Sequence, residues 1–207
     1  RVFLGNSGTE VVEAAIKLAR KATGRQAIVG FDGGFHGRTY RSLTLTASKA
    51  NYHAGFGPLL PGIHHAPFGR VEDLAWFDEL LFARIVPPDE VAAIIVEPIQ
   101  GEGGVVPADR AYLQAVQELC RERGMLLMVD EVQTGFCRTG KWFGFEHAGI
   151  SPDVVTFAKG MGNGMPVGAV WARTDIASVM APGDHGSTYS GTALATAAVN
   201  AVIDEME

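Results

Sequence analysis

Short apolar runs alternate with helix-length segments along the whole 207-residue chain, and this alternation limits the possible folds more than any other feature. The runs are three to six residues long and bounded by polar or turn-forming residues, which is typical of buried strands. Strands separated by helix-length segments favour a mainly parallel sheet covered by helices on both faces. We therefore predict an α/β fold with three layers, α/β/α. The predicted strands are 2–4, 27–31, 92–96, 125–129, 154–158 and 167–172, and the predicted helices are 7–24, 73–85, 109–123 and 193–206.

Composition and charge exclude several classes of protein. The formal charge is -6 and 47% of the residues are hydrophobic, which fits one domain with a substantial core. Basic residues form no stripe for nucleic acid, and no apolar run approaches the roughly 20 residues of a bilayer span. Two cysteines, Cys120 and Cys137, make no disulfide framework, so we expect a reducing cytoplasm. Because a strand-like run begins at Val2, we expect an interior piece of a longer protein without a signal peptide.

Two charged residues follow neighbouring strand-like runs. Asp130 ends the run 125–129, and Lys159 ends the run 154–158. In an open α/β sheet, ligands bind in the crevice beyond the carboxyl ends of the strands. The two charges could pair with each other, but desolvation offsets most of the gain from a buried ion pair. A lysine partly removed from water is instead an amine nucleophile that forms a Schiff base with an aldehyde, of which pyridoxal 5'-phosphate is the commonest.

Such a cofactor needs a site for its phosphate. Ser7 and Glu10 have capping-box spacing at the start of the first predicted helix, so the amides of Gly8 and Thr9 would point toward an anion. Many helices begin in this way and bind nothing. The segment 186–188, in which two hydroxyls precede another predicted helix, is a second candidate.

The cofactor ring needs flat or small apolar groups on its two faces. Phe35 lies between glycines in the segment 33–37, where the backbone can approach a ligand closely. The alternative is an ordinary turn with one phenylalanine in the core. Val132 follows Asp130 by two residues and has the right size for the opposite face, and Gln133 could donate a hydrogen bond to the ring hydroxyl.

Six motifs occur in order along the chain: Asn6–Glu10, Phe35–Thr39, Glu97–Gly104, Asp130–Gly135, Ala158–Gly160 and His185–Thr188. Taken together and in this order, they resemble those of the class III aminotransferases. These pyridoxal-phosphate enzymes include 4-aminobutyrate, ornithine and acetylornithine aminotransferases. The resemblance runs from the first residues of the chain to the last. Departures are modest: the segment 189–193 replaces a common Gly-Gly-Asn-Pro, and Cys137 stands where glycine is usual.

The resemblance implies a role for each matched position. Lys159 resembles the Schiff-base lysine, and Asp130 resembles the partner of the pyridine nitrogen. The family places Glu102, in some members, opposite an arginine of its C-terminal part that gates the second substrate. The other implied site residues are Phe35 and Val132 for the ring faces, Gln133 for the ring hydroxyl, His36 beside the cofactor, Gly8 and Thr9 for the phosphate, Glu97 near the substrate with Glu102, and Thr188 for the phosphate of the neighbouring subunit.

The resemblance also implies a fold, an assembly and a reaction. Residues 1–207 would form the large cofactor domain of fold type I, without the family's N-terminal segment and C-terminal small domain, and would be inactive alone. The full protein would be a homodimer with its active site at the subunit interface. It would move an amino group to a 2-oxo acid from an omega-amino acid resembling 4-aminobutyrate, with acetylornithine or ornithine and alanine-glyoxylate transamination as alternatives. The segment 56–62 resembles 4-aminobutyrate and acetylornithine enzymes, whereas 159–166 resembles alanine-glyoxylate and omega-amino-acid enzymes. The groups that bind the substrate carboxylate are expected outside this chain.

Functions of other classes have weaker support. The segment 135–141 nearly spells a nucleotide-binding P-loop after a strand, but Trp142 stands where serine or threonine must reach magnesium. The six histidines are scattered, and the adjacent pair His64 and His65 lacks metal-ligand spacing, so no metal site is expected. A purely structural module would not require Lys159 together with Asp130.

Overall fold

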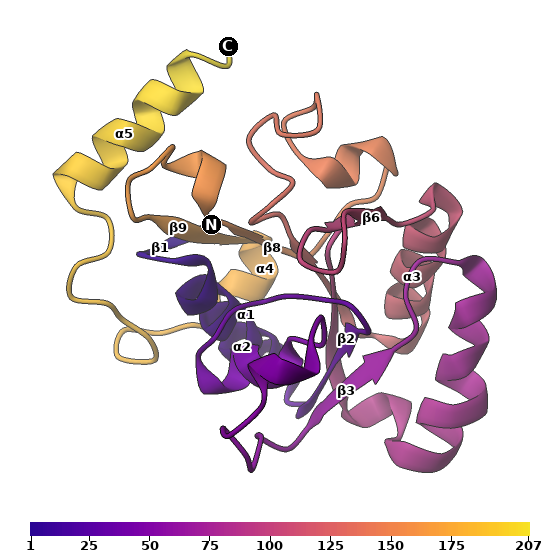
Figure 1. The fold of residues 1–207 in the computed structure, drawn as a ribbon. Coiled ribbons are helices and arrows are strands. Elements are labelled where there is room, and N and C mark those ends of the chain that lie inside the picture. Colours follow the sequence, from indigo (N-terminus) through magenta and orange to yellow (C-terminus); the bar gives the residue numbers. More distant parts are fainter.

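A seven-stranded sheet forms the centre of the molecule in the computed structural model, which describes residues 1–207 (Figure 1). The strand order across the sheet is β1-β9-β8-β7-β4-β2-β3. The strands are β1 (Val2–Gly5), β2 (Ala27–Phe31), β3 (Ile63–Ala66), β4 (Val91–Val96), β7 (Leu126–Asp130), β8 (Val154–Phe157) and β9 (Gly168–Ala172).

The sheet is mainly parallel, as the alternation of strands and helices predicts. Only β9 runs against its neighbours β1 and β8, whereas β3, β2, β4, β7 and β8 pair in parallel. In the register of β7 with β8, Asp130 lies opposite Thr156. The last residue of β7 and the residues that follow β8 therefore leave the sheet at the same edge.

Helices cover both faces of the sheet. Helix α1 (Gly8–Thr23) begins after Ser7, whose hydroxyl accepts the amide of Glu10 at 3.4 Å, and ends at Gly24 with φ 71°. Its buried stripe packs in one apolar cluster with β4, β7 and β9. Helix α3 (Arg110–Arg123) packs in a second cluster with the inner residues of β2, β4 and β7. These two clusters confirm the three-layer prediction.

The predicted helix 73–85 takes a different form. A 3-10 turn, η2 (Val71–Leu74), is followed by a π-helical segment, η3 (Phe77–Ile85), which ends with the amide of Val86 donating to the carbonyl of Leu81. Phe77 and Leu81 are still buried against the sheet, so the wider turn keeps the apolar contacts that the sequence pattern predicted.

Several short elements lie outside the sequence prediction. Helix α2 (Tyr40–Leu45) and the ladder of β5 (Ile99–Gln100) with β6 (Val106–Pro107) connect longer elements.

Helix α5 (Ala193–Asp204) ends the chain and extends away from the body of the molecule (Figure 1). None of the helices combines the length and apolarity of a bilayer span. The remaining elements are α4 (Thr174–Ala177) and the 3-10 turns η1 (Ala50–Tyr52), η4 (Pro88–Glu90), η5 (Gly144–His147) and η6 (Lys159–Met161).

Candidate active site

A cavity of about 430 Å³ lies at the sheet edge where β7 and β8 end, and it contains both Asp130 and Lys159. Its volume is within the range of small-molecule sites. The structure brings the predicted site residues together around this one cavity, except Thr188, and their individual roles stay predictions. The predicted site residues that line the cavity are Gly8, Thr9, Phe35, His36, Glu97, Glu102, Asp130, Val132, Gln133 and Lys159.

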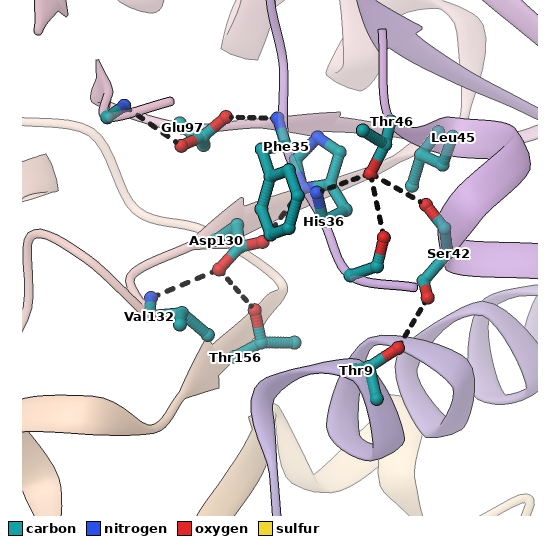
Figure 2. Close-up of polar contacts among 12 residues, drawn as sticks. Thr9, Phe35, His36, Ser42, Leu45, Thr46, Glu97, Asp130, Val132 and Thr156 are labelled. Carbon is teal, nitrogen blue, oxygen red and sulfur yellow. Dashed lines mark hydrogen bonds and ion pairs between the residues drawn. The ribbon is translucent and has the colours of Figure 1, made fainter. Parts of the chain in front are cut away.

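Three donors hold the buried carboxylate of Asp130 (Figure 2). Its Oδ1 accepts the Val132 amide at 3.0 Å and the Thr156 hydroxyl at 3.1 Å. Its Oδ2 lies 2.7 Å from Nδ1 of His36. These contacts come from the loop after β7, from β8 and from the loop after β2, so three separate parts of the fold fix the orientation of one carboxylate.

His36 is in direct contact with this carboxylate and is 4% exposed. Burial alone would lower the pKa of His36, but the hydrogen bond and the charge of Asp130 outweigh burial and raise it. The His36 amide also donates to the Thr46 hydroxyl at 2.9 Å, which fixes the loop that carries the imidazole. His36 and Asp130 thus form a buried pair at the base of the cavity.

Glu97 is a second buried acid in the cavity wall, 6% exposed. Burial raises the pKa of Glu97, although the nearby charge of His36 opposes that rise. Its carboxylate accepts the amides of Phe35 at 2.8 Å and Gly101 at 3.3 Å. Glu97 therefore joins the loop that bears Phe35 to the turn after β5.

Lys159 begins the turn η6, two residues after β8 ends, and its φ is +47°. Left-handed backbone is unusual for a residue other than glycine and often marks a functional position. Its amine donates to Oε1 of Gln133 and does not pair with Asp130, so the alternative of a structural ion pair between them is wrong. The side chain is exposed, contrary to the expectation that the fold removes it from water, because it lies at the open side of the cavity.

The start of α1 forms another wall of the cavity. The amides of its first turn, including those of Gly8 and Thr9, have no acceptor within the helix. A Cβ on Gly8 would lie 3.2 Å from a methyl group of Val132, so glycine permits the close approach of α1 to the loop after β7. The Thr9 hydroxyl faces the loop after β2, where it accepts the amides of Arg38 at 3.3 Å and Thr39 at 3.2 Å and lies 2.5 Å from the Ser42 hydroxyl. Thr9 thus offers an anion its amide rather than its side chain.

Arg38 also lines the cavity, and the sequence analysis did not single it out. Its guanidinium lies over the rings of Tyr52, at 4.3 Å, and Phe35, at 5.5 Å. No carboxylate of the chain forms an ion pair with it. The sequence signal that could have identified Arg38 as a site residue is its place in the same motif as Phe35.

Glu131 is a further buried acid missed by the sequence analysis, 1% exposed beside Asp130. Burial raises its pKa, while its carboxylate accepts the Thr134 hydroxyl at 2.5 Å and the amides of Gly144 and Phe145 at 2.9 and 2.8 Å. These bonds close the loop after β7 and support Val132 and Gln133 from behind. Glu131 therefore acts on the site through the position of this loop.

The segment that contains Thr188 lies beside the cavity without lining it, and its Ser187 hydroxyl accepts the side-chain amide of Asn6, a lining residue, at 3.1 Å. Thr188 is exposed and does not line the cavity, and α5 begins only after Thr192. The segment 186–188 is therefore not a second helix-start phosphate site. The assignment of Thr188 to a neighbouring subunit's phosphate stays a prediction.

The loop 135–141 lacks the geometry of a P-loop. It consists of turns in which Phe136 and Cys137 have φ values of 53° and 60°. No helix begins at Lys141, and the next element is the short 3-10 turn η5. The helix-start amides that cradle nucleotide phosphates are therefore not formed there.

Known proteins with the same sequence features are aminotransferases. The family described as aminotransferase class-III matches residues 1–207. An acetylornithine aminotransferase of Listeria monocytogenes is 47% identical over 206 residues, which cover 100% of this chain and 51% of that protein. An acetylornithine aminotransferase of Methanopyrus kandleri is 49% identical over 203 residues, which cover 98% of this chain and 50% of that protein. The chain thus spans about half the length of these relatives.

A solved structure has the same fold. The ornithine aminotransferase of Toxoplasma gondii, described with partial occupancy of PLP at its active site, superposes with a TM-score of 0.89 and 36% identity. The match covers 99% of this chain and 49% of that chain. The fold is accordingly that of the fold type I transaminases, and the chain belongs to the class III aminotransferase family.

Proposed function

We propose that the full-length protein is a pyridoxal-phosphate-dependent aminotransferase that moves the terminal amino group of acetylornithine or ornithine to a 2-oxo acid. The relatives named acetylornithine and ornithine aminotransferase favour this donor over the 4-aminobutyrate-like donor ranked first from the motifs. The observation that carries the proposal is one cavity that contains Lys159, Asp130 and the start of α1, with the lysine and the acid free of each other.

The cavity residues fit the cofactor by their chemistry and positions. The amides of Gly8 and Thr9 suit a phosphate, and the Asp130 carboxylate suits a protonated pyridine nitrogen. Phe35 and Val132 offer apolar surfaces for the two ring faces, and the amine of Lys159 suits the aldehyde. We propose that residues 1–207 are the large cofactor domain of the full protein.

Bound in this cavity, pyridoxal phosphate supplies a ring that withdraws electrons from the carbon bearing the donor's amino group. Asp130, held by its three donors, would hold the ring nitrogen in its protonated form. Lys159 would be the base that takes the proton from the donor carbon bearing the amino group and carries it on its Nζ. Gln133, which contacts the Lys159 amine, positions that amine.

The sequence motifs led us to expect the groups that bind the donor's carboxylate outside this chain, but Arg38 within it suits that carboxylate. It is a cavity-lining cation without an acidic partner, and two aromatic rings fix its position. A guanidinium binds a carboxylate through two parallel hydrogen bonds. The amino group at the other end of a five-carbon donor would then reach toward Lys159.

We also propose that the protein is a homodimer. The exposed residues Thr188 and Tyr189 support this assembly, because side chains that do not line their own cavity are available to the site of a second copy.

The direct test replaces the lysine in the full-length protein. Lys159→Ala should lose the visible absorbance of the lysine-linked cofactor and all turnover, whereas Lys141→Ala, at an exposed lysine outside the cavity, should keep both. Near-normal turnover by Lys159→Ala would reject the proposal.

The donor is tested with two matched amines. N-acetylputrescine has the structure of acetylornithine without its carboxylate, so the ratio of kcat/KM for the two isolates carboxylate recognition. Arg38→Met should lower kcat/KM for acetylornithine by roughly ten- to a hundredfold, since a hydrogen bond to a charged group contributes about 1.5–3 kcal/mol. N-acetylputrescine should be nearly unaffected, and equal losses for both amines would contradict the role of Arg38.

A further inference from the structure

The loop that carries Phe35 is held to a buried acid from a distant part of the chain (Figure 2). Glu97 directly follows β4, and its Oε1 accepts the Phe35 amide at 2.8 Å across 62 positions of sequence. Its Oε2 accepts the Gly101 amide at 3.3 Å. Both oxygens of this cavity-lining carboxylate therefore already bind backbone amides.

The contact with Glu97 differs from the other hydrogen bonds of this loop. The amides from Gly33 to His36 all have acceptors, and three of the four donate to neutral oxygens of residues 31, 46 and 47. The Phe35 amide alone donates to a carboxylate, and hydrogen bonds to an ionised partner are roughly twice as strong as neutral ones. Because Gly33 and Gly37 give the loop little stiffness of its own, Glu97 is the strongest restraint on the backbone that carries the ring.

Glu131 is a second buried acid with the same structural features, which makes it a reference for Glu97. Its carboxylate also accepts two amides, at 2.9 and 2.8 Å, and burial raises the pKa of both acids. Of the two, only Glu97 lines the cavity and only Glu97 holds Phe35. Comparison of these acids therefore separates a role in cofactor binding from a role in the fold alone.

We propose that Glu97 is a positioning residue whose carboxylate holds Phe35 against the face of the cofactor ring. The inference rests on the proposed function, because it places a cofactor ring at Phe35. The two amides on Glu97 favour this role over direct contact with the amino donor. Without Glu97 the loop would leave its place for part of the time, and the affinity for the cofactor would fall with the fraction of molecules in which the loop is in place.

The test replaces Glu97 in the full-length protein and measures the dissociation constant of pyridoxal phosphate. Glu97→Leu fills similar volume but accepts no hydrogen bond, so the constant should rise about five- to a hundredfold, the effect of an unpaired buried amide. Glu97→Gln keeps one oxygen for the Phe35 amide, and its constant should stay within about threefold of the parent value. Glu97→Ala is the second variant if leucine prevents folding, and the same outcomes apply to it.

A double-mutant cycle tests whether Glu97 acts through Phe35. In a Phe35→Ala background no ring remains to be positioned, so Glu97→Leu should change the dissociation constant by less than about twofold. Glu131→Leu is the matched control, because it also removes a buried carboxylate that accepts two amides, but from the loop after β7. Its effect should be the same with and without the Phe35 ring. Urea unfolding of the cofactor-free proteins checks that each variant folds.

The donor supplies an independent measurement. At saturating cofactor, the ratio of kcat/KM for acetylornithine and N-acetylputrescine should be the same in Glu97→Leu and the parent, because Glu97 does not bind the donor's carboxylate.

Four results would overturn the inference: an unchanged dissociation constant in Glu97→Leu, an equal rise with and without the Phe35 ring, a rise in Glu97→Gln as large as in Glu97→Leu, or a changed ratio for the two amines. Failure of the proposed function would look different, because the parent protein would then show no saturable binding of pyridoxal phosphate and no lysine-linked absorbance.

Discussion

Gly37 is the position at which a single methyl group should disturb both the fold and the cofactor site. Its φ is +131°, and a Cβ there would clash with Oγ1 of Thr9 and lie 2.6 Å from the Thr9 Cβ and 2.7 Å from the Ser42 hydroxyl. Backbone outside the allowed regions costs about 1–3 kcal/mol, and overpacking of a close contact costs about 1–3 kcal/mol more. Gly37→Ala should therefore lower the free energy of unfolding by about 2–6 kcal/mol, a large part of a typical 5–15 kcal/mol.

Gly55→Ala is the matched control. Its φ is also positive, +81°, but nothing lies within 4 Å of the Cβ, so only the conformational cost of about 1–2 kcal/mol applies. Urea unfolding of the cofactor-free full-length protein measures both variants. Because Thr9 belongs to the helix start that faces the cavity, Gly37→Ala should also weaken cofactor binding, and Gly55→Ala should not. Equal losses of stability in the two variants would refute the argument from the clash.

Two further predictions concern the base of the cavity. Asp130→Asn should still bind the cofactor but slow single-turnover transamination by about a hundredfold or more, as expected for loss of a preorganised charge, and an unchanged rate would reject its role at the ring nitrogen. For His36, whose pKa the fold raises, the stabilisation is fully present below the unfolded pKa of about 6.5 and is lost as the pH rises through the folded value. The stability advantage of the parent over His36→Gln in urea unfolding should thus shrink between pH 6 and pH 9, and a constant advantage would show that His36 does not titrate with folding.

The positions of Asp130 and Lys159 could be predicted from sequence because they depend on a local pattern and one general rule. Each follows a short apolar run, and parallel strands bring such positions to one edge of the sheet. The same reasoning located helix α1 and its glycine end, since capping residues and apolar spacing are local signals.

The rest of the site depends on contacts between distant parts of the chain. His36 and Asp130 are in contact although they are 94 positions apart in the sequence. No local pattern around either residue predicts this contact. Arg38 is conspicuous only once the rings of Phe35 and Tyr52 are in place and no acid is found beside it. The short strand β3 reads Ile-His-His-Ala, which is too polar and too brief for periodicity to reveal.

The left-handed backbone of Lys159 lowers the stability of the fold at the residue that the proposed activity requires. Glycine adopts a φ of +47° at a lower conformational cost than lysine does. Lysine at this position therefore strains the backbone while it places an amine in the cavity. A library of variants chosen for heat resistance without any screen for turnover should therefore accumulate glycine at position 159. The most heat-resistant variants of such a library would then lack the lysine and have no turnover.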